Sequence, residues 1–490
     1  MNPRFSMRQA LSDPALLGAA LVGDSWAAWR TLLIAAMGER LTRAERALFA
    51  RLTGRQREPG KRVEELWAVI GRRGGKSRAM SVLAAYVGGL CEHTDKLAPG
   101  ERGIVLCIAP DQKQAGIVLD YCEAAFRAAP VLAQLIARRT SDTLELTNRI
   151  SIEVRSSNFR RLRGPTYIAV LADEAAFWYS DESANPDTEI LNAVRPGLST
   201  TGGPLIVASS PYARRGELWR AHRTHYGPEG DSLVLVAQGA SRDFNSTLSQ
   251  RVVDRALERD PASAAAEYLA QFRADIEAFI SREAVEAVVA RGVRERAPLP
   301  GVSYFAFTDP SGGSADSFTL AVSHREAGRA VIDCVRETRP PFSPESVVAE
   351  YATLLKTYRV NSVRGDRYAG EWPREQFRKR AIGYVPAAKP KSDLYLDLLP
   401  AVNSGLVDLL DHDRLAAQLV GLERRTSRAG RDSIDHAPGG HDDLANCVAG
   451  AVNLALHRRE EQVATGLPIF LGPSEPHWGG GAAHPGTYGR

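Results

Sequence analysis

A glycine-rich segment with one lysine and one serine lies between an apolar stretch and a helical stretch. It follows the apolar residues Leu66–Ile70 directly. Small residues at such a turn let backbone N–H groups converge on phosphate oxygens, and the start of the next helix adds its positive end. In this arrangement Lys76 would contact the β- and γ-phosphates of a nucleotide, and the Ser77 hydroxyl would coordinate Mg²⁺. The predicted phosphate loop consists of Gly71, Arg72, Arg73, Gly74, Gly75, Lys76 and Ser77.

The spacing departs from the general phosphate-loop pattern, which would place a glycine where the chain has Ile70. Taken alone, the segment could be an ordinary glycine-rich turn. A second stretch favours a nucleotide site, because Tyr167–Glu174 is an apolar strand that ends in two carboxylates. Asp173 would hold Mg²⁺ through water, and Glu174 would polarise the attacking water as a general base. The alternative is a buried strand that merely ends in acidic residues.

A third apolar stretch, Leu205–Pro211, ends in the hydroxyl residues Ser209 and Ser210. Hydroxyl groups there could sense the γ-phosphate and couple its hydrolysis to movement, although many strands end in serine. Arginine is the usual group for stabilising the charge on a transferring phosphoryl. The sequence does not choose among several arginines that could act within the subunit or on a neighbour: Arg72, Arg73, Arg138, Arg139, Arg160, Arg161 and Arg163.

A second group of acidic residues recurs at the ends of apolar stretches nearer the carboxyl terminus. Asp309 ends the stretch that begins at Ser303, Asp366 ends the one that begins at Ser362, and Asp442 and Asp443 precede an apolar helix. Three carboxylates from separate elements form a hard-ligand pocket for Mg²⁺ or Mn²⁺. Two such metals can activate water and stabilise the leaving 3′-oxygen in phosphodiester hydrolysis.

Each of these aspartates alone has a simpler interpretation as a turn or capping residue, and the last pair could cap its helix. The recurrence within one α/β unit favours the metal pocket. Of the last pair, we favour Asp443 as the direct ligand and Asp442 as secondary. Further candidates are His441 and Asp316 for the metal site, and Lys389 and Lys391 for a phosphate of the DNA backbone.

The surrounding pattern predicts two α/β units. Short apolar strands alternate with helical stretches from residue 63 to about 240, which predicts a mostly parallel sheet with helices on both faces. From Gly301, three strands, a helix and another strand follow the order of an RNase H-like nuclease core. The expected organisation is a helical segment at 1–45, a P-loop ATPase domain at 46–248, a helical linker or subdomain at 249–300, the nuclease domain at 301–458 and a disordered tail at 459–490.

Bulk properties limit the class of protein only loosely. The 490 residues are too many for one ordinary domain, and 44% hydrophobic with 24% charged residues is typical of a globular chain. A net charge of +4 permits a nucleic-acid partner without arguing for one. The five cysteines show no CxxC spacing, which argues against a zinc site or a disulfide framework. The sequence has no stretch typical of a signal peptide and no apolar run of about 18 residues. We therefore predict a reducing, cytoplasmic compartment and no membrane contact.

Taken together, these motifs resemble those of the large terminase subunit of tailed bacteriophages and of gene-transfer particles. Any single motif is weak, but the ordered set is specific and spans roughly residues 50–455. The motifs are GRRGGKS (71–77), VLADEAAF (170–177), ASSP (208–211), TDPSGGSADSFT (308–319), GDRYAGEW (365–372) and GGHDDLAN (439–446). The tight phosphate loop is common in that family.

The resemblance implies an ASCE-type ATPase joined to an RNase H-like nuclease. Lys76 and Ser77 would bind ATP, Asp173 would support Mg²⁺, Glu174 would be the catalytic base, and Ser209–Ser210 would form the coupling segment. Asp309, Asp366 and Asp443 would hold the nuclease metals, and a segment near Arg55–Pro59 would contact the adenine.

The same resemblance implies partners. Such subunits dock as a homo-oligomeric ring on the portal protein of a procapsid and are expected to be monomers in solution. They pump double-stranded DNA inward, cut the concatemer, and act with a small terminase subunit that selects the DNA. The expected location is the host cytoplasm and, transiently, the procapsid, but not the mature virion.

Two other readings remain open. The first is a nucleic-acid translocase or helicase-like ATPase whose carboxyl-terminal domain is not catalytic; it would be favoured if the three aspartates failed to converge. The second is a non-catalytic docking protein with a degenerate nucleotide pocket. The intact Lys76, Ser77, Asp173 and Glu174 argue against the second reading.

Overall fold

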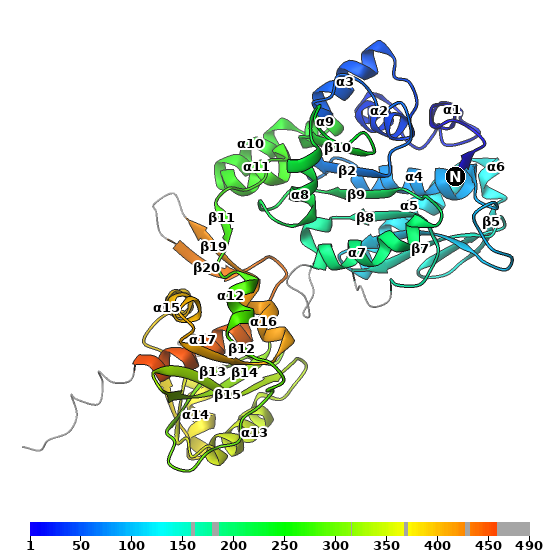
Figure 1. Ribbon diagram of the computed structural model, residues 1–490. Coiled ribbons are helices and arrows are strands. Elements are labelled where there is room, and N and C mark those ends of the chain that lie inside the picture. The colour runs from blue at the N-terminus through cyan, green and yellow to red at the C-terminus, as the bar shows by residue number, and fades with distance from the viewer. Residues whose placement is uncertain (158–161, 179–185, 315, 367–370, 427–431, 458–490) are drawn as a thin grey trace, which may run out of the picture.

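The structure is a computed structural model that describes residues 1–157, 162–178, 186–314, 316–366, 371–426 and 432–457. It has two parts, each built around its own β-sheet (Figure 1). The amino-terminal part, blue to green in the figure, and the second part, green to red, lie at opposite ends of the view, with a small three-stranded sheet between them. No helix within the described ranges is both long and apolar enough to cross a membrane.

The first sheet has eight strands in the order β10-β2-β9-β8-β4-β7-β6-β5. Neighbours from β10 to β7 are parallel, and β6 and β5 continue the sheet antiparallel. Strands covered on both faces are apolar throughout, and the sequence expectation of a mostly parallel sheet is confirmed. The strands are β2 (Glu65–Ile70), β4 (Gly103–Ala109), β5 (Ile136–Arg139), β6 (Thr143–Leu146), β7 (Ile150–Ser156), β8 (Tyr167–Asp173), β9 (Leu205–Ser209) and β10 (Val234–Gly239).

Helices cover both faces of this sheet, as the alternating pattern predicts (Figure 1). One face packs against the amino-terminal helices and the helices that follow β2 and β4, whereas the other packs against α7 and α8. The helices are α1 (Met7–Ser12), α2 (Ala27–Ala36), α3 (Arg43–Thr53), α4 (Lys76–Leu90), α5 (Gln112–Ala128), α6 (Pro130–Ala133), α7 (Pro186–Ser199), α8 (Gly216–His225) and α9 (Ser241–Phe244). A two-stranded ribbon pairs β1 (Asn2–Pro3) with β3 (Cys91–Glu92).

One feature of the strand order bears directly on the nucleotide site. Strand β9 lies between β2, which leads into the glycine-rich loop, and β8, which ends at Asp173. An extra strand between these two is the arrangement of ASCE-type P-loop folds, so that prediction is confirmed. The carboxyl ends of all three parallel strands meet at one edge, which is where α/β sheets place their ligands.

The second sheet has seven strands in the order β12-β18-β15-β14-β13-β16-β17. Strand β14 is antiparallel to both of its neighbours, whereas β13, β16 and β17 are parallel. This is the strand order of an RNase H-like core and confirms the predicted fold. The strands are β12 (Val289–Ala290), β13 (Tyr304–Asp309), β14 (Phe318–Glu326), β15 (Arg329–Thr338), β16 (Ser362–Gly365), β17 (Gly383–Pro386) and β18 (Val407–Leu410).

Two hydrophobic layers enclose the second sheet. One lies under the apolar helix that begins at Asp443, and the other lies under α13 and α14. The helices are α13 (Pro344–Thr357), α14 (Glu371–Lys379), α15 (Lys391–Asn403), α16 (Asp413–Val420) and α17 (Asp443–His457). Helix α17 thereby carries its first residue to the edge where β13 and β16 end.

The segment between the two sheets contains both helices and strands. It consists of α10 (Gln250–Arg259), α11 (Pro261–Leu269), β11 (Ile276–Ala278) and α12 (Arg282–Ala287). The break between α10 and α11 falls at Asp260, whose side chain caps α11, with Pro261 at the first helical position. Strand β11 joins β19 (Leu422–Thr426) and β20 (Asp432–His436) in the small sheet. The predicted tail at 459–490 lies outside the described residues.

Candidate active sites

The glycine-rich loop lies between β2 and α4, as its sequence predicts. Gly75 has φ +79°, a left-handed conformation that favours glycine, and a Cβ there would lie 2.8 Å from the Trp26 ring. Lys76 is 5% exposed, and its ammonium lies 2.9 Å from Ser210 Oγ and 3.2 Å from the carbonyl oxygen of Ile70. The loop is therefore held closed around a buried lysine, at the amino-terminus of a 15-residue helix.

Asp173 and Glu174 lie at the end of β8 and face this loop. Asp173 Oδ2 accepts a hydrogen bond of 2.7 Å from the Ser77 hydroxyl, and Lys76 Nζ lies 3.0 Å from Glu174 Oε1. Glu174 itself has φ 51° and ψ 42°, a conformation that is strained for a residue with a side chain and is often found at functional sites. The four residues that the sequence assigns to the nucleotide centre thus form one cluster.

The two serines at the end of β9 complete this cluster. Glu174 Oε2 accepts hydrogen bonds from the Ser210 backbone N–H at 3.0 Å and from Ser209 Oγ at 3.3 Å. Ser210 therefore contacts both the lysine of the loop and the carboxylate expected to act as base. This places the predicted coupling segment at the point where a γ-phosphate would lie.

The environment of Asp173 suits a divalent cation. Its Oδ1 atom is buried and has no hydrogen-bond partner within the described part of the chain. Burial, together with the charge of Glu174, raises the pKa of Asp173 to about 6. A buried carboxylate oxygen beside a second carboxylate is a suitable ligand, direct or through water, for Mg²⁺.

Several residues of this site were missed by sequence reasoning. Trp29 Nε1 donates to the Gly74 carbonyl at 2.7 Å, Gln114 Nε2 lies 3.4 Å from Asp173 Oδ2, and Asn245 Nδ2 donates to the Arg73 carbonyl at 3.0 Å. They line or support a pocket of about 680 Å³ that also contains Trp26 and Phe177. No local spacing identifies them, because each comes from a different element.

The candidate arginines fall into different settings. Arg72 and Arg73 line the pocket, and Arg72 also pairs with Glu267 of α11 at 3.2 Å. Arg139 instead pairs with Asp120 and Glu123. Arg138 lies at the edge strand β5, Arg163 is exposed, and Arg160 and Arg161 lie outside the described residues.

The adenine contact expected near Arg55–Pro59 stays a prediction, and the structure gives Arg55 itself other partners. The Arg55 guanidinium is buried and donates to the backbone carbonyls of Gly227, His225, Asp231 and Val234. Residues 55–59, all described, are not among those that line the nucleotide pocket. Arg55 instead fixes the loop before β10, because a buried guanidinium needs its donors satisfied.

The second group of carboxylates lines a pocket of about 580 Å³ at the edge of the second sheet. Asp309 ends β13, Asp366 follows the parallel neighbour β16, and Asp443 begins α17. Asn446, one turn into α17, donates from Nδ2 to Asp309 Oδ2 at 2.7 Å, and Asp443 Oδ2 accepts from the Ser317 N–H at 3.3 Å. The three predicted metal ligands therefore line one pocket, but among the described residues only Asp435, His436 and Asp442 have ligand atoms that all lie within 4.8 Å of one another.

The carboxylates in this pocket repel one another, which favours the binding of a cation. Burial raises the pKa of Asp309 to about 7, and Asp443, Asp366 and Asp442 shift it in the same direction, against the hydrogen bond from Asn446. Burial and the charge of Asp442 also raise the pKa of Asp443 to about 6. Oxygen ligands that repel one another in this way match the preferences of Mg²⁺ and Mn²⁺.

Asp442 has a different environment from Asp443. Its Oδ2 lies 2.9 Å from both the Tyr395 hydroxyl and Lys391 Nζ. These contacts support the ranking of Asp443 as the direct ligand, which stays a prediction. Lys389 pairs with Asp397 at 2.6 Å, so neither of the two lysines expected to meet DNA lies without a carboxylate partner.

Lys391 also contacts a residue that sequence reasoning missed. Its Nζ lies 2.9 Å from Asp435 Oδ1, and ligand atoms of Asp435, His436 and Asp442 lie within 4.8 Å of one another. Asp435 and His436 come from β20, four and three residues before the GGHDDLAN motif, with no spacing that would have identified them. His441, a further candidate for the metal site, has its Nδ1 4.0 Å from Asp443 Oδ2.

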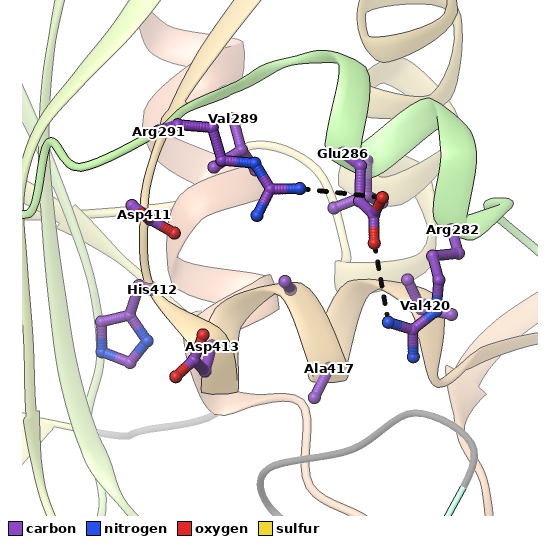
Figure 2. Close-up of a pocket in the computed structure, with 11 residues that line it drawn as sticks. Arg282, Glu286, Val289, Arg291, Asp411, His412, Asp413, Ala417 and Val420 are labelled. Carbon is purple, nitrogen blue, oxygen red and sulfur yellow. Dashed lines mark ion pairs between the residues drawn. The ribbon is translucent and has the colours of Figure 1, made fainter. Parts of the chain in front are cut away.

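A further pocket of about 140 Å³ lies between α12 and α16 (Figure 2). Figure 2 shows Glu286 between Arg282 and Arg291, at 3.6 and 3.7 Å. Asp411 accepts a hydrogen bond from the Gly292 N–H, and His412 caps α16. Arg282, Glu286, Arg291 and Asp411 are thus engaged with the protein itself, so we assign this pocket no site.

The fold and the two sites define a class: a P-loop fold of the ASCE type joined to an RNase H-like domain with a carboxylate pocket. No family model matches the sequence, and no curated protein matches it. Among solved structures, the HK97 bacteriophage large terminase is similar at 16% identity and a TM-score of 0.37, over 85% of this chain and 95% of that chain.

Two other solved structures are similar. The large terminase nuclease from thermophilic phage G20c with bound magnesium has 19% identity and a TM-score of 0.32, over 36% of this chain and 98% of that chain. A large terminase from a thermophilic bacteriophage in complex with ADP has 12% identity and a TM-score of 0.36, over 81% of this chain and 94% of that chain. At these values the similarity establishes no activity for this chain.

Proposed function

We propose that this chain is the motor and nuclease subunit of a viral DNA-packaging machine. ATP hydrolysis in the first part would drive double-stranded DNA into a procapsid, and a two-metal endonuclease in the second part would cut the concatemer. The observation that carries the proposal is the presence of both centres, in this order, on one chain. Each centre has the residues that its chemistry requires.

The nucleotide centre supports hydrolysis rather than binding alone. A carboxylate that is to polarise water must be close to the γ-phosphate but free to reach the water. In this structure Glu174 contacts Lys76 and Ser210, the two residues that we expect to bind the γ-phosphate. We infer that the γ-phosphate takes over the lysine, which leaves Glu174 to orient the water while Asp173 and Ser77 hold Mg²⁺.

The second centre supports phosphodiester hydrolysis. Asp309, Asp366 and Asp443 lie on three elements around one pocket and offer only oxygen ligands. Bound Mg²⁺ or Mn²⁺ would supply Lewis-acid activation of water and of the leaving oxygen. Asn446 would keep Asp309 in its ligating orientation, because its amide donates to one oxygen and leaves the other available.

The packaging role and the partners rest on the resemblance of the ordered motifs to large terminases. We propose double-stranded DNA as the substrate, the portal protein of the procapsid and a small terminase subunit as partners, and a ring of copies when docked. The place of action would be the host cytoplasm and, transiently, the procapsid. ATP and Mg²⁺ would be the cofactors, with Mn²⁺ as an alternative in the nuclease.

Two variants test the proposal together. Lys76→Ala should abolish ATP hydrolysis while leaving Mn²⁺-dependent cutting of plasmid DNA largely intact, and Asp366→Ala should do the reverse. Asp254→Ala is a control, because Asp254 is exposed on α10. Full plasmid cutting by Asp366→Ala would exclude the metal assignment and favour a translocase with a non-catalytic second part. ATP turnover unchanged by Glu174→Gln would favour a docking protein instead.

A further inference from the structure

We propose that the strand pair β19–β20 connects the nucleotide centre to the nuclease centre, with Glu423 as the positioning residue that joins the two parts. The inference rests on the proposed function and adds how one centre would control the other. A chain of hydrogen bonds, ion pairs and paired strand residues leads from Glu174 to the neighbour of Asp443.

The first links lie beside the nucleotide centre. Ser210 binds both Lys76 and Glu174, and one residue separates it from Tyr212. The Tyr212 ring lies 5.7 Å from the ring of Phe177, which lines the nucleotide pocket. A rearrangement of Ser210 around a γ-phosphate would therefore also displace Tyr212.

The next link crosses to the small sheet between the two parts. The Tyr212 hydroxyl donates to Glu423 Oε2 at 2.7 Å, and the Arg215 guanidinium pairs with Glu423 Oε1. The Glu423 side chain is 0% exposed, and its remaining cationic contact is Arg425 at 3.1 Å. A buried carboxylate is tolerated only while its partners stay in place, so the first part cannot shift here without moving β19.

The strand pair then carries the connection across its own width. Glu423 lies directly opposite Asp435 in the antiparallel register of β19 and β20. Side chains of opposite residues share a face of the sheet, and like charges in that position repel. Each carboxylate therefore depends on a cation from a different part: Arg215 for Glu423 and Lys391 for Asp435.

The last links reach the nuclease centre. Lys391 Nζ lies 2.9 Å from Asp435 Oδ1 and 2.9 Å from Asp442 Oδ2. Lys391 therefore joins a carboxylate of β20 to the neighbour of Asp443. A movement of β20 would shift Asp435 relative to Lys391. The contact between Lys391 and Asp442 would then change, and so would the orientation of Asp442 beside the predicted metal ligand Asp443.

The test compares cleavage with and without nucleotide. Plasmid cutting in Mn²⁺ is measured for the full chain in the absence of nucleotide and with a non-hydrolysable ATP analogue. Wild type should show a rate that differs by roughly fivefold or more between the two conditions, the lower end of typical coupling between sites. Glu423→Gln and Tyr212→Phe should each bring that ratio close to one while cutting without nucleotide persists.

Controls separate coupling from a structural defect. Glu277→Gln changes an exposed glutamate on β11 of the same small sheet and should keep the wild-type ratio. Thermal unfolding checks that each variant is folded, and Tyr212→Phe, which removes one hydroxyl, remains informative if Glu423→Gln does not fold.

The possible failures are distinct. Wild type with neither ATP hydrolysis nor cutting would overturn the proposed function. Wild type with both activities but no nucleotide effect on cutting would overturn the connection alone. So would a wild-type ratio in both Glu423→Gln and Tyr212→Phe.

Discussion

The Lys76 ammonium lies 3.0 Å from Glu174 Oε1, so the buried cation of the phosphate loop forms an ion pair with the partly exposed carboxylate that is the expected catalytic base. Both residues are also held by Ser210. Because a phosphate oxygen would compete with Glu174 for the same ammonium, nucleotide binding and activation of the base are linked events at this site.

Glu174→Gln should separate binding from turnover. A glutamine cannot accept a proton, so ATP hydrolysis should fall by about 10²–10⁴-fold. Nucleotide affinity should stay the same or increase, because Lys76 no longer has a carboxylate competing with the phosphate. Phosphate release and binding of a fluorescent ATP analogue measure the two effects. Glu258→Gln, an exposed change on α10, is the control; a parallel loss of affinity and turnover would contradict the assigned role.

Trp29→Phe should loosen the phosphate loop without removing any group expected to touch nucleotide. The indole N–H donates to the Gly74 carbonyl at 2.7 Å, and a phenylalanine leaves that buried carbonyl unpaired while keeping the packing on Phe244. The free energy of unfolding should fall by about 1–3 kcal/mol, and nucleotide affinity should weaken. Denaturant unfolding and nucleotide titration measure these changes. An unchanged affinity would show that the loop does not depend on this bond, and Trp372→Phe on exposed α14 serves for comparison.

The sequence predicts both folds and the central residues of both sites because these features are local. A strand, a glycine-rich turn and a helix determine where Lys76 and Ser77 lie, and Asp173 and Glu174 end a buried strand. The supporting residues could not be predicted in this way. Asn446 reaches Asp309 across 137 positions, and neither residue type is unusual at its place in the sequence.

The same limit explains why two long-range contacts could not be predicted. Arg55 precedes the phosphate loop in sequence, yet its guanidinium donates hydrogen bonds to backbone carbonyls of a loop about 170 residues further on. The Tyr212–Glu423 contact joins residues 211 positions apart. Such pairs depend on how two separately folded sheets are joined, and no periodicity or motif within either unit contains that information.

The carboxylate pocket predicts how metal and pH act on stability. The pKa of Asp309, about 7 in the folded chain, exceeds its ordinary value of 3.8. Between these two values the folded state holds a proton that the unfolded state has released, so raising the pH through this window should destabilise the metal-free protein. A metal at about 100 times its Kd should add about 2.7 kcal/mol, and its affinity should weaken as the pH falls below 7.

Thermal unfolding from pH 5 to 8, with and without Mn²⁺, checks these effects. Asp309→Asn removes one titrating group, so it should reduce the pH dependence of the metal-free protein, leaving the part due to Asp443 and Asp173, whose pKa values are about 6, and it should lose most of the metal-induced stabilisation. The nucleotide site supplies an internal control, because ADP should stabilise this variant as it does wild type. Full stabilisation of Asp309→Asn by Mn²⁺ would place the metal elsewhere.

Gly450→Ala should disturb the nuclease centre by changing the packing between α17 and β13. A Cβ at Gly450 would lie 2.3 Å from the Phe307 ring, so α17 would have to move away from β13. Overpacking of this kind costs about 1–3 kcal/mol, and here it also shifts Asp443 and Asn446, which α17 carries to the pocket. We therefore expect lower stability and slower plasmid cutting, with ATP hydrolysis retained. Gly116→Ala is the matched change, because a Cβ in helix α5 meets nothing within 4 Å and should add about 0.5–1 kcal/mol. Wild-type cutting by a destabilised Gly450→Ala would mean that the position of α17 does not limit the nuclease.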